Sequence, residues 1–331
     1  MKPLIRLFFT DFWSGFDPYN NFFVNLLKLK YNLEITPNNP DFVIFSCYGT
    51  DYQKFNKSVL IFYTAENLRP SFWECNYSVS FDYNTYNDRN LRLPLYVLYG
   101  FDSTLLNPKN PNEILANKTK FCNFIVSNAM CKTRNEFFKI LNSKKQVDSG
   151  GRYLNNIGRE IPNKLEFIKD YRFTIAFENT SSPGYTTEKI FEPMKVNSIP
   201  IYWGNKLINR EFNTKSFINV HDFGTLNECA DYIIELDSNK EKLTELLKET
   251  WFINNEFPKE FNDQYFLDFF DPILTKKNHN EIIQWQAKTS YFIRNSRFRR
   301  MLNYRIRENW IYLKSVKLAP ITKRHLLKLI E

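Results

Sequence analysis

The chain has 331 residues, of which 43% are hydrophobic, 17% aromatic and 24% charged, and its formal net charge is +9 at pH 7. This composition is typical of a folded globular protein and excludes disorder over most of the chain. The positive charge is concentrated in residues 286–331, which carry 12 Lys or Arg and 2 Asp or Glu, so the net charge says nothing about the rest of the protein.

Short apolar runs rich in β-branched and aromatic residues alternate along the chain with helical patterns. The expected strands are Leu4–Phe9, Phe42–Ser46, Val59–Tyr63, Phe121–Val126, Phe173–Phe177, Ile199–Trp203 and Phe217–Val220. The expected helices are Asn21–Lys30, Thr133–Asn142, Thr187–Val196, Leu226–Leu236 and Lys240–Asn254. This alternation predicts an α/β architecture with parallel sheets, in a chain long enough for two domains.

A polar segment predicts the boundary between the two domains. Residues Asp102–Thr119 contain several Asn, Pro and Lys with little apolar periodicity, as in a linker. We therefore expect an N-terminal α/β domain of residues 1–117, a second α/β domain of residues 118–285, and a basic aromatic tail of residues 286–331. Ligands of open α/β sheets bind beyond the carboxyl ends of the strands, so polar residues that follow strands become the candidates.

The first such motif is LIFYTAENLRP, Leu60–Pro70, in which an apolar strand runs into a polar turn. Glu66 stands at the carboxyl end of that strand. A carboxylate there can act as a general base if partial desolvation brings its pKa toward the working pH. The alternative is a glutamate that caps the turn Leu68–Trp73, and the local pattern alone favours that structural role.

Two further motifs follow the next expected strand. In SNAMCKTRNEFFKILN, Ser127–Asn142, Arg134 lies in the first turn of an amphipathic helix. Its planar guanidinium can form a fork onto a diphosphate, although a surface salt bridge explains it equally well. In VDSGGR, Val147–Arg152, the paired glycines permit a close backbone approach or a positive φ, and an ordinary tight turn is the alternative.

The richest motif is FTIAFENTSSPGYTTEKIFEP, Phe173–Pro193. A strand, a Gly- and Pro-containing loop and a helix start follow one another, with Thr186 or Thr187 as the N-cap. Helix N-termini favour anions, so Lys189 in the first turn makes sense if a phosphate lies beside it. Glu188 could accept hydrogen bonds from ribose hydroxyls. The alternative is an ordinary capped helix with surface charges.

Several familiar signals are missing from the sequence. No Asp-x-Asp pair, Walker loop or GxGxxG fingerprint is present. The histidines His221, His279 and His325 are far apart, which argues against a histidine metal site, and we expect a structural role for His221. Five scattered cysteines without a CxxC pair predict free thiols in a reducing compartment; they are Cys47, Cys75, Cys122, Cys131 and Cys229.

The N-terminal segment does not read as a secretory signal. Arg6 and Asp11 interrupt its apolar run, and no charge-free apolar run of about 20 residues occurs elsewhere. We therefore expect a cytoplasmic protein. The tail mixes Lys and Arg with aromatic residues in amphipathic patterns, which predicts peripheral association with the inner face of the cytoplasmic membrane. Packing of the tail on the body and nucleic-acid binding are the alternatives, and no nucleic-acid reader fold accompanies the second.

Together these motifs resemble the bacterial α-1,3/4-fucosyltransferase family. The resemblance rests on FYTAEN, SNAMCKTRNEFF, VDSGGR with NNIG, the FEN…GYTTEKI block, and SIPIYWGNKLINREFNTKSFINVHDF at Ser198–Phe223. It is dense from Leu60 to about Phe223 and looser over the first sixty residues. The resemblance implies a GT-B type fold, in which two Rossmann-like α/β domains face a central cleft. The C-terminal domain would hold GDP-fucose and the N-terminal domain would face the acceptor.

The resemblance also implies roles for individual residues. Arg134 and Lys189 match the phosphate-binding positions of the family, and Glu188 matches its ribose contact. Further donor-binding positions fall on Asn179 and Tyr185, and Glu178 matches a motif glutamate near the donor. Glu66 matches the proposed general base.

The implied reaction is an inverting transfer of L-fucose from GDP-fucose to a hydroxyl of a GlcNAc-containing, N-acetyllactosamine-type glycan. Glu66 would take the hydroxyl proton, while Arg134 and Lys189 neutralise the departing diphosphate. Two cations there could replace a metal, so no cofactor is required, although Mg or Mn could stimulate. A transferase for another GDP-linked sugar and an inactive nucleotide- or glycan-binding relative remain as alternatives.

Two features depart from the family pattern. Ala65 stands where many bacterial members have glycine, beside the expected base. The heptad repeats that follow the catalytic region in some members are missing, so oligomerisation through such repeats is not supported.

Aromatic residues for stacking on sugar rings are plentiful in the N-terminal half; they include Trp13, Tyr48, Trp73 and Tyr86.

Overall fold

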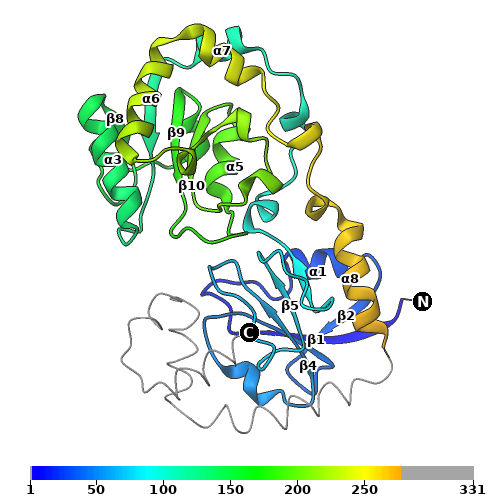
Figure 1. The fold of residues 1–331 in the computed structure, drawn as a ribbon. Helices are drawn as coiled ribbons and strands as arrows, with labels where there is room; N and C mark the ends of the chain where they lie inside the picture. Colours follow the sequence, from blue (N-terminus) through cyan, green and yellow to red (C-terminus); the bar gives the residue numbers. More distant parts are fainter. Residues whose placement is uncertain (1, 277–331) are drawn as a thin grey trace, which may run out of the picture. The chain divides into compact units, whose positions relative to one another are not determined.

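The computed structural model describes residues 2–276, and the basic tail of residues 286–331 lies outside this range. Within the described residues the chain folds into two compact units, one formed by residues 2–80 with residues 272–276, the other by Phe81–Asp271. The chain therefore leaves the first unit after Ser80 and re-enters it at Pro272 (Figure 1). The domain bounds expected from the sequence, 1–117 and 118–285, differ from this division and stay a prediction.

The first unit is built on a parallel sheet. Its strands run in the order β2 (Asn32–Ile35), β1 (Leu4–Thr10), β3 (Phe42–Phe45), β4 (Val59–Tyr63) and β5 (Tyr77–Ser80). All residues of β3 and β4 are buried, as strands covered on both faces require. Helix α1 (Phe22–Leu27) begins after Asn21, whose side chain accepts a hydrogen bond from the Val24 amide.

Apolar side chains fill both faces of this first sheet. One face carries a cluster that includes Val43, Phe45, Leu60 and Phe62. The other face carries aromatic rings, among which Phe23 contacts Phe9 in a tilted arrangement and Tyr63 edge-on. Many of the abundant aromatic residues thus lie in the core, where such ring pairs add stability beyond that of their buried area.

The second unit contains a second parallel sheet. Its strands run in the order β11 (Ile218–Asn219), β10 (Ile199–Trp203), β9 (Tyr171–Phe177), β7 (Lys120–Phe124) and β8 (Val147–Ser149). A short strand, β6 (Asn90–Arg92), precedes them in the chain. The parallel α/β architecture expected from the sequence is therefore present in both units.

Helices cover both faces of the second sheet (Figure 1). One face is covered by α3 (Lys132–Lys144), α6 (Leu226–Ser238) and α7 (Lys240–Lys248), whose apolar residues share one core with the strands. Helix α5 (Glu188–Lys195) packs on β9 and β10. The remaining helices are α2 (Pro111–Asn117), α4 (Lys164–Ile168) and α8 (Asp263–Thr275).

Two of the expected segments differ from the structure. The expected linker Asp102–Thr119 contains helix α2, because Asn110 caps its start and Pro111 occupies its first turn, although none of its residues is buried. The helix expected over Lys240–Asn254 ends at Lys248. Beyond that point Asn254 has a left-handed φ of 54°, which a helix excludes.

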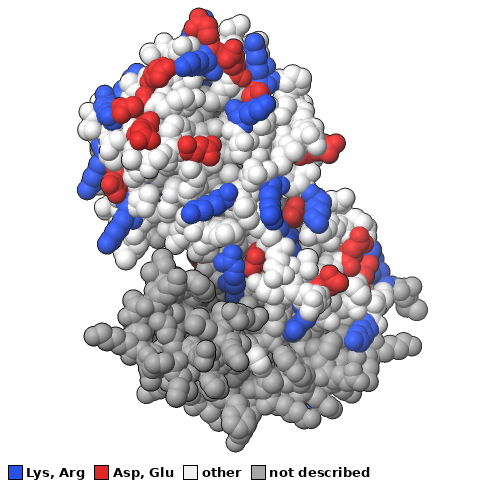
Figure 2. All heavy atoms as spheres, viewed as in Figure 1, with Lys and Arg blue, Asp and Glu red and all other residues white. Residues whose placement is uncertain are grey.

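Surface charge in the described residues is mixed. Figure 2 shows one face, on which Lys or Arg and Asp or Glu side chains are interspersed without a large patch of either sign. All five cysteines are free, as expected, and all but Cys47 are buried. Among residues 2–276 no helix is long and apolar enough to cross a membrane.

Candidate active site

The order of the strands places the expected donor residues at one edge of the second sheet. The chain passes from β7 outward to β8, then returns past β7 to β9 and continues to β10. The reversal occurs between β7 and β9, and such a switch point opens a crevice at the carboxyl ends of the two strands. Arg134 follows β7, whereas Glu178 and Asn179 follow β9.

Arg134 is held in that crevice by three oxygen atoms. Its Nη1 donates to the Phe177 carbonyl at 3.2 Å and to Asn179 Oδ1 at 2.9 Å, and its Nη2 donates to the Asn128 carbonyl at 2.6 Å. The side chain is 2% exposed, and this burial lowers the pKa of Arg134. Its Nε has no hydrogen-bond partner among the described residues. The surface salt bridge considered from the sequence is therefore wrong, because the guanidinium is buried against main-chain carbonyls.

Glu178 organises the start of helix α5. Its fully buried carboxylate accepts a hydrogen bond from the Thr187 amide at 2.7 Å and from the Thr187 hydroxyl at 2.8 Å. Thr187 is the N-cap of the helix, as the motif predicted, and its hydroxyl also accepts from the Lys189 amide. Burial raises the pKa of Glu178, against the opposing effect of the nearby Lys189 ammonium.

Lys189 lies between two carboxylates. Its Nζ is 3.1 Å from Glu188 Oε1 and 3.4 Å from Glu178 Oε2, and it donates to the Thr187 hydroxyl at 3.0 Å. Burial alone would lower the pKa of Lys189, but the two carboxylates outweigh it and raise the pKa. The pKa of Glu188 is lowered, because Lys189 and Lys164 outweigh its burial. Both groups are therefore charged at neutral pH.

Arg134 and Lys189 line the same small cavity. Its volume is about 20 Å³, room for roughly one water molecule, and Lys164, Thr174 and Pro193 also contribute to its walls. Helices α3 and α5 thus bring a guanidinium and an ammonium together at the carboxyl edge of the sheet. Positive charge placed in this way stabilises anions such as phosphates.

Tyr185 lies in the loop between β9 and α5. Its ring is 4% exposed and contacts Phe81 edge-on, at 5.3 Å between ring centroids. Its amide donates to the Ser182 carbonyl at 3.1 Å. Tyr185 is therefore a fixed part of the loop wall beside the N-terminus of α5.

The paired glycines follow strand β8. A Cβ atom on Gly151 would lie 2.1 Å from the Val126 carbonyl oxygen, and one on Gly150 would lie 2.0 Å from the Ile161 side chain. Neither glycine has a positive φ. The close backbone approach considered from the sequence is therefore present at Gly151, whereas Gly150 closely approaches a side chain.

His221 packs beside the loop between β9 and α5. Its Nε2 is 3.2 Å from the Gly204 carbonyl oxygen and 3.4 Å from Ser181 Oγ, and its ring stacks on Trp203. Burial lowers the pKa of His221, which favours the neutral ring. These contacts are consistent with the structural role expected for it.

Glu66 belongs to the first unit, where it follows strand β4. It is exposed, and its Oε1 accepts a hydrogen bond from the Tyr48 hydroxyl at 3.0 Å. Tyr48 in turn meets Trp13 edge-on, at 6.4 Å between ring centroids. Both rings are exposed, at 52% for Tyr48 and 42% for Trp13. This carboxylate therefore stands beside two aromatic surfaces of the kind that stack on sugar rings.

The first sheet has its own switch point close to this cluster. The chain passes from β1 to β2 on one side, then to β3 on the other side of β1. Trp13 follows β1 and Tyr48 follows β3, so both lie at the carboxyl edge where ligands of such sheets bind.

The expected site residues thus fall into two groups. The structure brings Arg134, Glu178, Asn179, Glu188 and Lys189 together in the second unit, with Tyr185 in the adjoining loop. Glu66 lies in the first unit with Tyr48 and Trp13. The sequence named Tyr48 only among the aromatic candidates and Thr187 only as a possible N-cap, and it predicted neither the Glu66–Tyr48 nor the Glu178–Thr187 contact. The Glu66–Tyr48 contact joins two strand ends, which only the strand order brings together.

Two family models match the chain. The model described as the N-terminal domain of alpha-(1,3)-fucosyltransferase FucT matches residues 7–99. The model described as the C-terminal part of glycosyltransferase family 10 (fucosyltransferase) matches residues 115–265. The two matches together contain every expected site residue, from Glu66 to Lys189.

Individual relatives agree with these models. The chain is 37% identical over 221 residues to alpha-(1,3)-fucosyltransferase FucT of Helicobacter pylori, which covers 57% of this chain and 46% of that protein. It is 32% identical to the 3-galactosyl-N-acetylglucosaminide 4-alpha-L-fucosyltransferase FUT3 of Bos taurus, over 40% of this chain and 38% of that protein. The chain thus spans less than half the length of these curated relatives.

A solved structure is similar over most of its length. The crystal structure of an alpha1,3-fucosyltransferase with GDP-fucose superposes with a TM-score of 0.72 at 28% identity, covering 84% of this chain and 92% of that one. With a parallel α/β sheet in each unit, this likeness identifies the fold as GT-B type.

Proposed function

Because the chain belongs to the fucosyltransferase family of glycosyltransferases, we propose that it transfers L-fucose from GDP-fucose to a hydroxyl of a GlcNAc-containing glycan. The observation that carries this proposal is that Arg134 and Lys189 lie together at the switch point of the second sheet. A nucleoside diphosphate is the ligand for which such a pair of cations at two helix N-termini is suited.

The proposed donor site assigns one task to each group. Arg134 and Lys189 hold the diphosphate, and Glu188 accepts hydrogen bonds from the ribose hydroxyls. Asn179 and Tyr185 complete the wall of the site, while Glu178 keeps Thr187 and Lys189 in place. As the bond between the anomeric carbon and the phosphate oxygen breaks, its electron pair leaves with GDP, and the two cations stabilise that charge.

The proposed acceptor site lies in the first unit. The acceptor sugar stacks on Trp13 and Tyr48, and its hydroxyl loses a proton to Glu66 as the oxygen attacks the anomeric carbon. A single displacement of this kind inverts the configuration of the transferred sugar. Linkage to position 3 or position 4 of GlcNAc is a choice made by the acceptor's orientation, and both activities occur in the names of the similar proteins.

A donor screen tests this function. The purified chain is incubated with N-acetyllactosamine and a panel of GDP-sugars, and the product is weighed by mass spectrometry. We expect the mass of one deoxyhexose to be added from GDP-fucose alone. Transfer from GDP-mannose instead would assign another GDP-linked sugar, and GDP binding without any transfer would leave a binding protein.

Glu66→Gln separates binding from chemistry. We expect GDP affinity to stay within about twofold of the unsubstituted chain, because Glu66 is not part of the donor set, and turnover to fall by about 10²-fold or more, the usual worth of a general base. Tyr48→Phe is the matched control, since it keeps the carboxylate and removes only its neighbour's hydroxyl. Turnover of Glu66→Gln within tenfold of the unsubstituted chain would assign the base to another group.

A further inference from the structure

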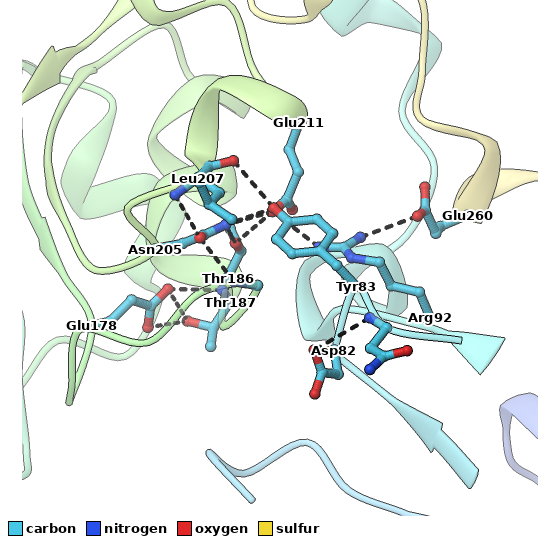
Figure 3. A network of polar contacts seen from close by, with 12 residues as sticks. Asp82, Tyr83, Arg92, Glu178, Thr186, Thr187, Asn205, Leu207, Glu211 and Glu260 are labelled. Atoms are coloured by element: carbon cyan, nitrogen blue, oxygen red, sulfur yellow. Dashed lines mark hydrogen bonds and ion pairs between the residues drawn. The ribbon is translucent and has the colours of Figure 1, made fainter. Parts of the chain in front are cut away.

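A buried polar cluster lies behind the loop that carries Tyr185. It is the Glu211 cluster, formed by Tyr83, Arg92, Thr186, Asn205, Glu211 and Glu260 (Figure 3). All of these residues belong to the second unit, yet they come from segments more than a hundred positions apart. None of them entered the donor site described above.

Glu211 is the centre of the cluster. Its Oε1 accepts hydrogen bonds from the Asn205 side-chain Nδ2 at 2.7 Å, from the Thr186 hydroxyl at 3.0 Å and from the Tyr83 hydroxyl. Glu211 is 4% exposed. Burying an ionised carboxylate is costly unless a cation and several donors compensate it, so these donors must stay in place for the carboxylate to be stable.

Arg92 supplies the compensating cation. Its Nη2 lies 2.9 Å from Glu211 Oε1 and its Nη1 lies 3.1 Å from Glu260 Oε1. The guanidinium also stacks over the Tyr83 ring at 4.4 Å. Burial would lower the pKa of Arg92, but Glu211 and the neighbouring groups raise it. Arg92 therefore carries a fixed positive charge between two carboxylates.

Hydrogen bonds from the cluster hold the loop on both sides of Tyr185. Before it, the Gly184 amide donates to Asn205 Oδ1 at 2.8 Å. After it, the Thr186 hydroxyl bonds Glu211 and accepts from Asn205 Nδ2 at 3.1 Å. Gly184 has a left-handed φ of 84°, and a Cβ atom there would lie 2.7 Å from the Phe81 carbonyl. The loop conformation is thus fixed by neighbours outside the loop.

We infer that Glu211, together with Arg92 and Asn205, positions residues 184–187 so that Tyr185 and the N-terminus of α5 are ready for the nucleoside diphosphate. A loop with Gly and Pro samples many conformations unless its surroundings restrict it. Because the loop is already ordered in the folded protein, donor binding does not have to include the entropy cost of ordering it. The inference rests on the proposed function for the identity of the ligand, but the ordering of the loop can be measured without any ligand.

Thr186 gives the sharpest test, because its hydroxyl is the loop's own link to Glu211. Thr186→Val removes that hydroxyl and keeps the shape of the side chain, whereas Thr186→Ser keeps the hydroxyl. We expect amide hydrogen exchange of the peptide spanning residues 180–188 to speed up by about three- to tenfold in Thr186→Val, as befits one hydrogen bond. Its Kd for GDP and its KM for GDP-fucose should rise by the same factor, with kcat changed less. Thr186→Ser should restore both.

A remote ion pair supplies the matched control. Arg172 pairs with Asp237 at 2.6 Å near the amino end of β9, away from the loop. Arg172→Met should lower the thermal stability of the second unit while leaving loop exchange and GDP affinity unchanged. If Arg172→Met perturbs the loop equally, the effect is one of general stability and the inference is wrong.

The remaining outcomes are distinct. Unchanged exchange and unchanged GDP affinity in Thr186→Val would overturn the positioning role; Thr186→Ala repeats the test should the valine variant fold poorly. An unsubstituted chain that binds no GDP would refute the proposed function, while the exchange measurement still decides whether the Glu211 cluster orders the loop.

Discussion

Arg134 and Lys189 carry their charges in different settings. Arg134 is held by two main-chain carbonyls and the Asn179 side chain, none of them charged. Lys189 instead sits against the carboxylates of Glu178 and Glu188. The guanidinium therefore keeps more of its positive charge uncompensated than the ammonium does, and it should contribute more of the field that attracts an anion.

Removal of the Lys189 ammonium should affect donor binding and stability separately. Lys189→Met should weaken GDP binding by about 2 kcal/mol, the worth of a charged hydrogen bond, and should also destabilise the fold, because Glu178 then lies buried without its cation. In the double variant Lys189→Met/Glu178→Gln the thermal stability should recover and the GDP affinity should not. Calorimetry and thermal unfolding measure the two effects.

Lys195→Met is the control for that experiment. Lys195 ends the same helix, and its Nζ donates to the Tyr99 carbonyl at 2.7 Å. GDP affinity should be unaffected by this change. A Kd that is the same in Lys189→Met and in the unsubstituted chain would remove Lys189 from the donor site.

Residue roles were predictable only where a motif carried them. The positions of Glu66, Arg134, Glu188 and Lys189 after strands could be read from the sequence. The contacts of these side chains could not be predicted, because the buried Arg134 guanidinium bonds carbonyl oxygens outside its own helix. The sequence also gave no signal for Glu211, since its partners lie up to 128 positions away.

At the scale of elements, the close approach of β8 to the neighbouring strand end makes Gly151 irreplaceable. Gly151→Ala would set a methyl group 2.1 Å from the Val126 carbonyl oxygen, an atom of the backbone that cannot swing aside. We expect a loss of about 3 kcal/mol in the free energy of unfolding, measured by urea denaturation.

Gly224→Ala is the matched control at the start of α6. Its new methyl group would meet only the flexible end of Glu228, at 3.0 Å. We expect a change within about 0.5 kcal/mol. Equal stability of the Gly151 and Gly224 variants would mean that the backbone at Val126 shifts to accommodate the methyl group, against this prediction.

Elements with a clear apolar pattern were easier to predict than elements without one. Strands β4 and β10 have the bounds that their apolar runs predicted. Strand β8, only three residues long, was missed, because three residues give no periodicity to read. Helix α8 was missed as well: its run of aromatic residues and its internal Pro272 obscured the helical spacing.

At the scale of the whole molecule, the α/β class followed from the alternation of patterns, but the order of the strands did not. The switch points that gather the site residues arise from strand crossovers, which local sequence does not encode. Helix α2 within the expected linker was not predicted either, because its start depends on the capping residues Asn110 and Pro111 and not on an apolar pattern.

The basic tail leads to a prediction for the full chain. A variant that ends at residue 285 should keep its transferase activity on a soluble acceptor and should no longer sediment with vesicles that contain anionic lipid. The physical reason is the excess of Lys and Arg in residues 286–331, which an anionic surface attracts. Neutral vesicles are the control, and equal sedimentation of the two chains would reject the membrane role.

The return of the chain to the first unit at Pro272 has a consequence for biosynthesis. Strands β1 to β5 all leave the ribosome before Phe81 does, but Ile273 and Leu274, which are buried in the finished protein, emerge only after the entire second unit. The nascent first unit therefore keeps part of its apolar surface uncovered until the second unit has been translated. Cotranslational maturation of this enzyme should accordingly finish with the first unit, although synthesis begins with it.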